Sequence, residues 1–141
     1  MPFRDLPPNW RSIRLKIAAF NPVADYQQVG LIAYQDDNTY LNVQRNFNGG
    51  SVIGFFKEAG GVVTRTDRRP LANTGNLILR LDRDPATNTY TAYYSVNNGS
   101  TWVPLTGAPT QTLTNPRLAI QVGSNEAGNL PVADLAWVEI H

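Results

Sequence analysis

The chain lacks cysteine altogether, and its single histidine is the last residue, His141. Without cysteine the protein can form neither disulfides nor a thiolate zinc site. A lone terminal histidine cannot complete a Ser-His-Asp triad or a multi-histidine metal site. No apolar run reaches the roughly 18 residues of a membrane-spanning helix, so we expect no membrane partner.

The chain also lacks an excess of charge of either sign. Its 12 Lys and Arg residues nearly balance 11 Asp and Glu residues, which gives no electrostatic reason to expect nucleic acid as a partner. The N-terminus has no apolar core of the kind found in signal peptides. Export would therefore need a signal outside these residues. A length of 141 residues suits one domain.

Helical periodicity is almost absent. Apolar residues alternate or form short runs, and clusters of Asn, Asp, Gly and Pro interrupt them, which predicts an all-β antiparallel sandwich. Residues 1–11, with Pro7 and Pro8, are expected to be an extended lead-in to a single domain over 12–141. The expected strands are Ser12–Phe20, Gln27–Gln35, Thr39–Asn46, Ser51–Glu58, Val62–Thr66, Asn76–Asp82, Thr89–Ser95, Thr101–Leu105, Arg117–Gly123 and Ala133–Ile140.

The outward positions of several expected strands hold amides and tyrosines where an ordinary solvated sheet has Lys and Glu. Amides form hydrogen bonds with hydroxyl groups, and aromatic rings offer a flat surface to the C–H face of a sugar. Cross-strand amide pairs on an idle surface explain the same pattern equally well. The residues expected to point outward include Tyr40, Asn42, Gln44, Asn46, Ala119 and Gln121.

Three stretches occur in the order QVGLIAYQDDNTYL (Gln28–Leu41), LRLDR…YTAYYS…GSTW (Leu79–Trp102) and ADLAWVEI (Ala133–Ile140). In this order they resemble the concanavalin A-like (laminin-G-like, DUF1349-type) jelly-roll domains appended to bacterial glycosidases. The resemblance implies two packed antiparallel sheets, with carbohydrate bound on one sheet face or in adjoining loops. It also implies that the chain is part of a larger secreted enzyme.

The turn Asn97–Gly99 resembles the Asp-box of sialidase-like hairpins, with Asn97 in the place of the Asp. Such a turn is structural: the short polar side chain binds turn amides, Gly99 adopts a positive φ, and Trp102 packs below.

Several members of the family hold a structural calcium, and Asp36, Asp37 and Asp134 could supply oxygen ligands here. However, Ala136 stands where the closing strand of the family usually has an Asp, and Asp-Asp-Asn is also an ordinary turn sequence. We therefore predict no cofactor, with calcium as the alternative.

No carboxylate pair indicates glycoside hydrolysis. Retaining hydrolases need two carboxylates about 5–5.5 Å apart, but Glu58, Glu126 and Glu139 are each isolated from other acidic residues. Asp84 begins a turn with Pro85, so we predict no catalytic activity. The basic stretch Thr64–Pro70 is expected to be a solvated loop, with a contact to an acidic sugar or a partner domain as the alternative.

We predict a non-catalytic carbohydrate-binding module of an exported, extracellular enzyme, with carbohydrate and the parent catalytic domain as partners. The alternative is a structural domain that docks or self-associates through a dry interface. The predicted ligand-binding residues supply aromatic platforms, amides and planar guanidinium donors. They are Tyr40, Asn42, Gln44, Arg80, Tyr93, Gln121 and Trp137, with Tyr34 and Arg14 as second choices. Arg80 and Tyr93 can join this site only if the strands place them on the same face as the amides.

Overall fold

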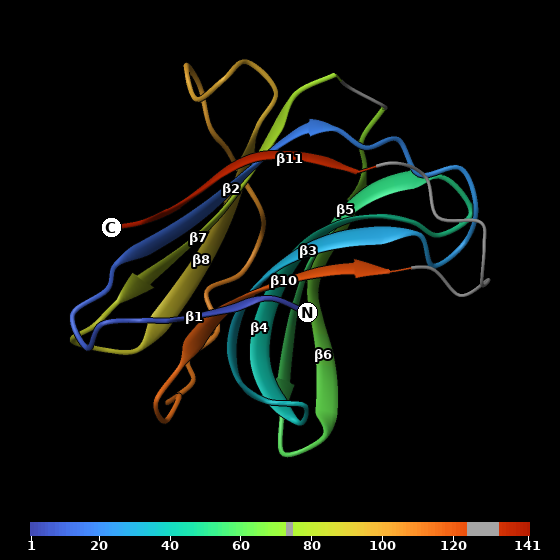
Figure 1. Cartoon of the computed structure of the whole chain (residues 1–141). Coiled ribbons are helices and arrows are strands. Elements are labelled where there is room, and N and C mark those ends of the chain that lie inside the picture. Colours follow the sequence, from blue (N-terminus) through green and yellow to red (C-terminus); the bar gives the residue numbers. More distant parts are fainter. Residues whose placement is uncertain (73–74, 124–132) are drawn as a thin grey trace.

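The computed structural model describes residues 1–72, 75–123 and 133–141. Within these ranges the protein consists of strands, turns and loops, and the strands form two antiparallel sheets that face each other (Figure 1). The predicted all-β antiparallel sandwich is therefore confirmed. The same ranges contain no helix of the length and apolarity needed to cross a membrane.

The two sheets differ in size. The six-stranded sheet, here called the large sheet, has the order β1 (Phe3–Asp5), β10 (Arg117–Gly123), β3 (Gln28–Asp36), β4 (Thr39–Phe47), β5 (Ser51–Ala59) and β6 (Val62–Pro70). The five-stranded small sheet has the order β11 (Asp134–Ile140), β2 (Ser12–Ala19), β7 (Leu77–Asp84), β8 (Thr89–Ser95) and β9 (Val103–Pro104). Figure 1 shows the small sheet toward the upper left, with β3, β4, β5 and β6 of the large sheet toward the right.

Alternation along the strands places every second side chain between the sheets. Leu31, Leu41 and Phe55 of the large sheet are buried, as are Leu15 and Leu79 of the small sheet. These residues belong to one continuous apolar core, which leaves the outer faces of both sheets for other roles.

One inward position of the large sheet is charged. Arg45 is buried and donates hydrogen bonds from Nη1 to the Leu71 carbonyl (2.6 Å) and from Nη2 to the Ala72 carbonyl (2.9 Å). Burial lowers the pKa of Arg45 to about 10, so the guanidinium remains charged at neutral pH and ties the chain after β6 to the sandwich.

The N-terminal residues, expected as a lead-in outside the sandwich, are extended but packed into it. Phe3–Asp5 forms β1 and pairs with β10 at the edge of the large sheet. Leu6 and Trp10 are buried in the core. Pro7 and Pro8 interrupt strand pairing only locally, because Leu6 and Trp10 on either side of them are buried between the sheets.

The basic stretch expected as a loop is instead the second half of an edge strand. β6 continues to Pro70, four residues beyond the predicted end at Thr66, with a bulge opposite Phe55 and Phe56. Charged side chains are common on edge strands because they discourage pairing with a further chain. The strand therefore brings Arg65 and Arg68 to the surface of the large sheet, where both are exposed.

Candidate functional site

The nine predicted ligand-binding residues lie on two opposite faces of the sandwich and cannot form one site. Strand register places one group on the outer face of the large sheet, namely Tyr34, Tyr40, Asn42, Gln44 and Gln121. The other group, Arg14, Arg80, Tyr93 and Trp137, lies on the outer face of the small sheet. The condition set by the sequence for joining Arg80 and Tyr93 to the amides is therefore not met.

On the large sheet, one transverse row of side chains crosses five strands. It contains, in register order, Gln121, Gly30, Gln44, Gly54 and Arg68, and we call it the amide row. Its four inter-strand steps span roughly 19 Å. Two amides and a guanidinium thus alternate with two positions that have no side chain.

The centre of this face is recessed. Asn42, Gln44 and Asn46 are only 6%, 8% and 8% exposed although they point away from the core. The Asn42 Nδ2 donates a hydrogen bond to Gln44 Oε1 at 3.1 Å, so the two amides hold each other. The Oδ1 atoms of Asn42 and Asn46 have no hydrogen-bond partner among the described residues.

The two glycines of the amide row are what allow neighbouring side chains to lie flat. A Cβ at Gly30 would come within 2.8 Å of Asn42 Oδ1. A Cβ at Gly54 would come within 2.5 Å of the Phe56 ring. Glycine inside a strand commonly marks such a close approach, and here the Asn42 and Phe56 side chains lie over the two glycines.

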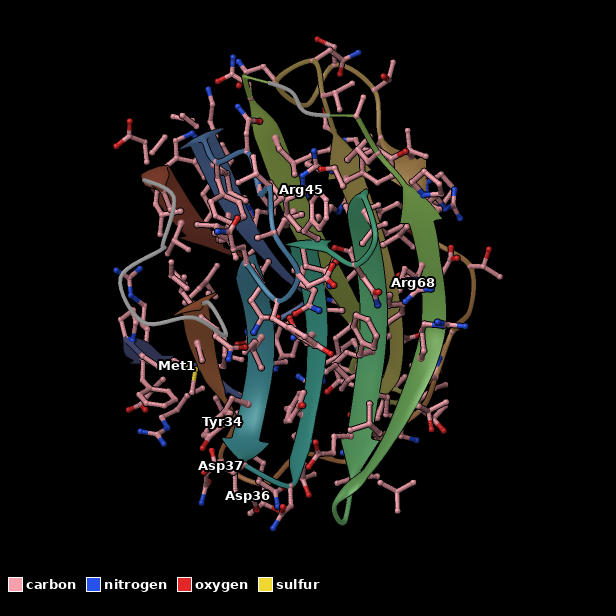
Figure 2. All side chains as sticks on the ribbon, turned by 90° about the vertical axis from the view of Figure 1, so that its right-hand side faces the viewer. Met1, Tyr34, Asp36, Asp37, Arg45 and Arg68 are labelled. Carbon is pink, nitrogen blue, oxygen red and sulfur yellow. The ribbon has the colours of Figure 1, made fainter. Side chains whose placement is uncertain are left out.

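A hollow lies at each end of the amide row. One has a volume of about 210 Å³ and is lined by Met1, Ile32, Tyr34, Asp37, Tyr40 and Gln121. The other, of about 670 Å³, lies where the β4–β5 hairpin meets the end of β6, and Val52, Arg68 and Pro70 are among its lining residues. Figure 2 shows Met1, Tyr34 and Asp37 toward one side of this face and Arg68 toward the other.

Both tyrosines of the first hollow are held by carboxylates. The Tyr40 hydroxyl donates to Glu58 Oε1 at 3.0 Å, and the Tyr34 hydroxyl donates to Asp37 Oδ1. Burial, followed by the hydrogen bond to Glu58, raises the pKa of Tyr40 to about 12. The hydrogen bond to Asp37 likewise raises the pKa of Tyr34. Both rings therefore stay neutral and fixed in orientation over a wide pH range.

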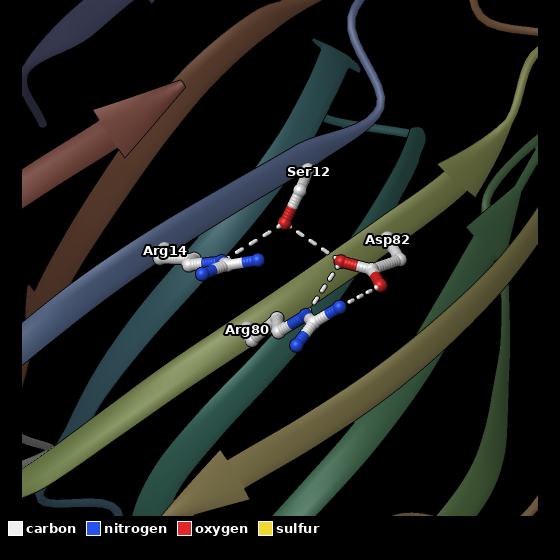
Figure 3. Close-up of polar contacts among 4 residues, drawn as sticks. All are labelled: Ser12, Arg14, Arg80 and Asp82. Carbon is white, nitrogen blue, oxygen red and sulfur yellow. Dashed lines mark hydrogen bonds and ion pairs between the residues drawn. The ribbon is translucent and has the colours of Figure 1, made fainter. Parts of the chain in front are cut away.

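The outer face of the small sheet is organised by charge. Arg14 and Arg80 are direct cross-strand partners. Arg80 binds Asp82 through two hydrogen bonds, from Nε to Oδ1 (2.8 Å) and from Nη2 to Oδ2 (2.6 Å). Ser12 Oγ donates to Asp82 Oδ1 at 2.7 Å and accepts from Arg14 Nε at 3.2 Å. Figure 3 shows this chain of contacts across β2 and β7.

The Trp102 ring covers this network. The guanidinium carbons of Arg14 and Arg80 lie 5.3 and 5.0 Å from its centroid, within cation–π range. The turn before it is built as predicted: Gly99 has φ of 85°, and Asn97 Oδ1 accepts a hydrogen bond from the Thr101 N–H. The structural role predicted for the turn is confirmed, while the contacts of Trp102 with two arginines were not predicted.

Four residues of the large-sheet face were not predicted from the sequence, namely Gly30, Gly54, Phe56 and Arg68. The two strand glycines were the available signal, because a glycine in an otherwise regular strand favours close packing above it. Arg68 could not be found without knowing that β6 continues past Thr66, since its register with Gly54 depends on that extension.

The acidic residues considered for calcium do not come together. Asp36 and Asp37 lie at the β3–β4 turn, where Asp36 Oδ1 accepts from the Asn38 N–H (2.9 Å), whereas Asp134 begins β11 of the other sheet. No group of three His, Cys, Asp or Glu side chains suited to a metal is found in the described part of the chain. Glu126, one of the isolated glutamates considered for hydrolysis, lies outside the described residues.

Comparison with known families identifies the domain. Residues 13–123 match the model of the beta-xylosidase C-terminal concanavalin A-like domain. The chain belongs to this family. The resemblance noted in the sequence is thereby confirmed, as is the concanavalin A-like class of the sandwich. No curated protein matches the chain.

Solved structures share the fold at low sequence identity. The GH43 BlXynB protein from Bacillus licheniformis has a TM-score of 0.80 and 20% identity over 93% of this chain. Bacteroides ovatus Xyloglucan PUL GH43B has a TM-score of 0.76 and 20% identity over 94%. This chain spans about 27% of each of those two chains. The carbohydrate binding module CBM66 from Bacillus subtilis, with 9% identity, reaches a TM-score of 0.53 over 84% of this chain and 68% of its own.

Proposed function

We propose that the chain is the non-catalytic C-terminal module of a larger, exported glycosidase and that it binds a neutral oligosaccharide along the amide row. The family membership supports the accessory role, because the family is defined by the C-terminal domain of beta-xylosidases. The fold shared with a carbohydrate binding module supports sugar as the ligand. The main observation is the amide row itself.

The amide row contains hydrogen-bonding groups that are unpaired within the described part of the chain. Three groups of the row have no hydrogen-bond partner among the described residues, namely Gln44 Nε2, the Gln121 amide and the Arg68 guanidinium. A sugar hydroxyl can both donate to and accept from such groups, whereas a row of like charges would favour an ion. Because the groups are spread over five strands and end in two hollows, they suit a chain of sugars better than a single sugar.

Aromatic rings flank the row at the places where a sugar face could rest. Tyr34 and Tyr40 line the smaller hollow, and the Phe56 ring lies over Gly54. Their fixed orientations reduce the conformational entropy lost on binding. In this proposal four of the predicted residues take no part in binding along the amide row, because they lie on the opposite sheet. They are Arg14, Arg80, Tyr93 and Trp137.

The proposal includes no catalytic step in this chain. Two carboxylates lie at or beside the smaller hollow, Asp37 and Glu58, and each accepts a hydrogen bond from a tyrosine hydroxyl and so serves to position a ring. Hydrolysis would belong to the separate catalytic domain of the parent enzyme. We expect the purified chain to release no sugar from xylosides or arabinosides.

Isothermal titration with soluble xylo-oligosaccharides, together with affinity gels of insoluble polysaccharides, tests the proposal. Gly30→Val should abolish binding, since its side chain fills the row and displaces Asn42. Gln44→Ala should weaken binding roughly threefold to tenfold, as expected for one lost hydrogen bond. Asn9→Ala removes an exposed amide outside the sheet and serves as the matched control. Absence of binding to every glycan tested would overturn the proposal.

Docking to the parent catalytic domain is the second candidate for this face. It is favoured by one observation: Met1 and Phe3 are 54% and 42% exposed, and the Phe3 ring lies 5.0 Å from that of Tyr34. These apolar side chains could rest against protein. Phe3→Ser would then release the catalytic domain from the module, measured by limited proteolysis of the two-domain enzyme.

A further inference from the structure

The outer face of the small sheet contains two arginines whose charges are balanced very differently. Arg80 shares its charge with Asp82 through two short hydrogen bonds, whereas Arg14 contacts no carboxylate within the described residues. Its only polar contact there runs from Nε to the Ser12 hydroxyl. Both Nη atoms of Arg14 are therefore left without an acceptor.

The position of Arg14 is nevertheless fixed. Ser12 holds its Nε on one side, and the Trp102 ring lies against its guanidinium. Ser12 is in turn oriented by Asp82, and Asp82 by Arg80 (Figure 3). A guanidinium held in this way loses little side-chain entropy when it binds a planar, bidentate acceptor such as a carboxylate.

The neighbouring charges leave this face with an excess of cations. Lys16, two positions along β2, donates only to the neutral Asn98 Oδ1 at 2.8 Å. Glu139 is the cross-strand partner of Arg14, but its carboxylate contacts His141 at 3.3 Å and makes no ion pair with Arg14. Asp82 is engaged by Arg80 and Ser12. An incoming anion would therefore meet Arg14 and Lys16 with no carboxylate bound to either.

A flat ring stands beside these cations. Trp137 is the cross-strand partner of Lys16, so it lies on the same outer face and diagonally from Arg14. It is only partly buried. This combination of an uncommitted guanidinium, an ammonium and an indole suits a ligand that has both a carboxylate and a ring.

We propose that Arg14, Lys16 and Trp137 form a second binding site, specific for a carboxylate-bearing sugar such as a uronate. The carboxylate binds the two Nη atoms of Arg14, Lys16 adds charge, and the pyranose ring rests against Trp137. The site is separate from the amide row on the opposite sheet and does not depend on sugar binding there.

A titration of the whole chain with sodium glucuronate at constant ionic strength, monitored by NMR, tests this site. Glucose keeps the ring and lacks the carboxylate, and acetate keeps the carboxylate and lacks the ring. We expect glucuronate to shift the Arg14 Nε–H and the indole N–H signals of Trp102 and Trp137. Glucose should produce no shift at these signals, and acetate should bind more weakly than glucuronate.

Two variants that each lose one positive charge, and a third that keeps every charge, show whether glucuronate binds at Arg14. Arg14→Gln should weaken glucuronate binding roughly tenfold or more, as expected when a charge-assisted pair of hydrogen bonds is lost. Arg65→Gln removes one positive charge from the large sheet and should change affinity by less than about twofold, because exposed charges at that distance are screened. Ser12→Ala keeps every charge but frees the Arg14 side chain, and should weaken binding by a smaller factor than Arg14→Gln.

Any one of three results would overturn the proposal of this site. They are no binding of glucuronate to the wild-type chain, an equal loss of glucuronate affinity in Arg14→Gln and Arg65→Gln, or acetate binding as tightly as glucuronate. If Arg14→Gln proves unfolded by circular dichroism, Ser12→Ala decides. Unchanged glucuronate affinity in a folded Ser12→Ala then counts against the proposal, and weakened affinity supports it.

Discussion

The two outer faces of the sandwich show two ways to keep a polar sheet surface in water. On the large sheet the amide row places Gly30 between Gln121 and Gln44, and its one charged side chain, Arg68, lies at the edge strand. On the small sheet the central row places Arg14 beside Arg80. The first face leaves Gln44 Nε2 and the Gln121 amide without a partner among the described residues, whereas the second uses most of its groups on one another.

This difference has consequences for stability. Two like charges directly opposite each other destabilise a strand pair, so the small sheet needs Asp82 and Trp102 to compensate for Arg14 and Arg80. The amides of the large sheet create no such repulsion, and Asn42 and Gln44 form a hydrogen bond with each other without a compensating charge. We therefore expect substitutions on the small-sheet face to lower the free energy of unfolding more than equivalent substitutions on the large-sheet face.

The largest effect should come from Trp102→Ala. The Trp102 ring and Ile78 both lie within 4 Å of the position that a Cβ on Gly99 would take, and Ile78 is buried although it points outward. Loss of the ring exposes Ile78 and removes two cation–π contacts, which should lower the free energy of unfolding by about 2–4 kcal/mol. Urea denaturation followed by far-ultraviolet circular dichroism measures the change.

Phe56→Ala on the large sheet is the matched control for this change. Phe56 covers a glycine and is partly exposed, so its loss should lower the free energy of unfolding by only about 1 kcal/mol. An equal or larger loss in Phe56→Ala would mean that the two faces do not differ in the way described.

A smaller effect should follow from Asp82→Asn, which keeps the shape and removes the charge. Asp82 and Arg80 side chains are each 22% exposed, so solvent weakens their interaction. We expect a loss of about 1–2 kcal/mol that shrinks at high salt. The isosteric change Glu58→Gln on the large sheet leaves an acceptor for the Tyr40 hydroxyl and should cost less than about 0.5 kcal/mol. A salt-independent loss in Asp82→Asn would contradict the electrostatic origin.

The fold could be predicted from the sequence because alternation is a local property of each strand. Leu77, Leu79 and Leu81 point inward as their spacing indicates, and the Asn97–Gly99 turn has the predicted geometry. The extent of β6 could not be predicted, since the pairing of Arg68 with Gly54 depends on a neighbour strand and a bulge.

The candidate site was harder to predict because it depends on which sheet each strand joins. Alternation shows that Tyr40 and Tyr93 both point outward, but both faces of a sandwich are outward. Only the strand order separates β4 from β8. Likewise, composition indicated exposed amides, whereas Asn42 and Gln44 are recessed because Gly30 and Gly54 leave room for their neighbours.

The last effect expected is a pH dependence on the large-sheet face, confined to alkaline pH. The pKa of Tyr40 is raised from 10.0 to about 12, first by burial and then by Glu58. A raised pKa means that the folded state favours the neutral phenol. This contribution to stability is complete below pH 10, and it is lost as the pH rises from about 10 to about 12, because the unfolded chain ionises first.

Tyr40→Phe removes the ionisable group, so the difference in free energy of unfolding between the wild type and this variant should narrow across that pH range. Urea denaturation at several pH values measures it. In Glu58→Gln the same decline should be smaller yet still present, because burial is the larger of the two causes. A difference between wild type and Tyr40→Phe that stays constant from pH 10 to 12 would show that the ring is more hydrated than its place in the recessed face implies.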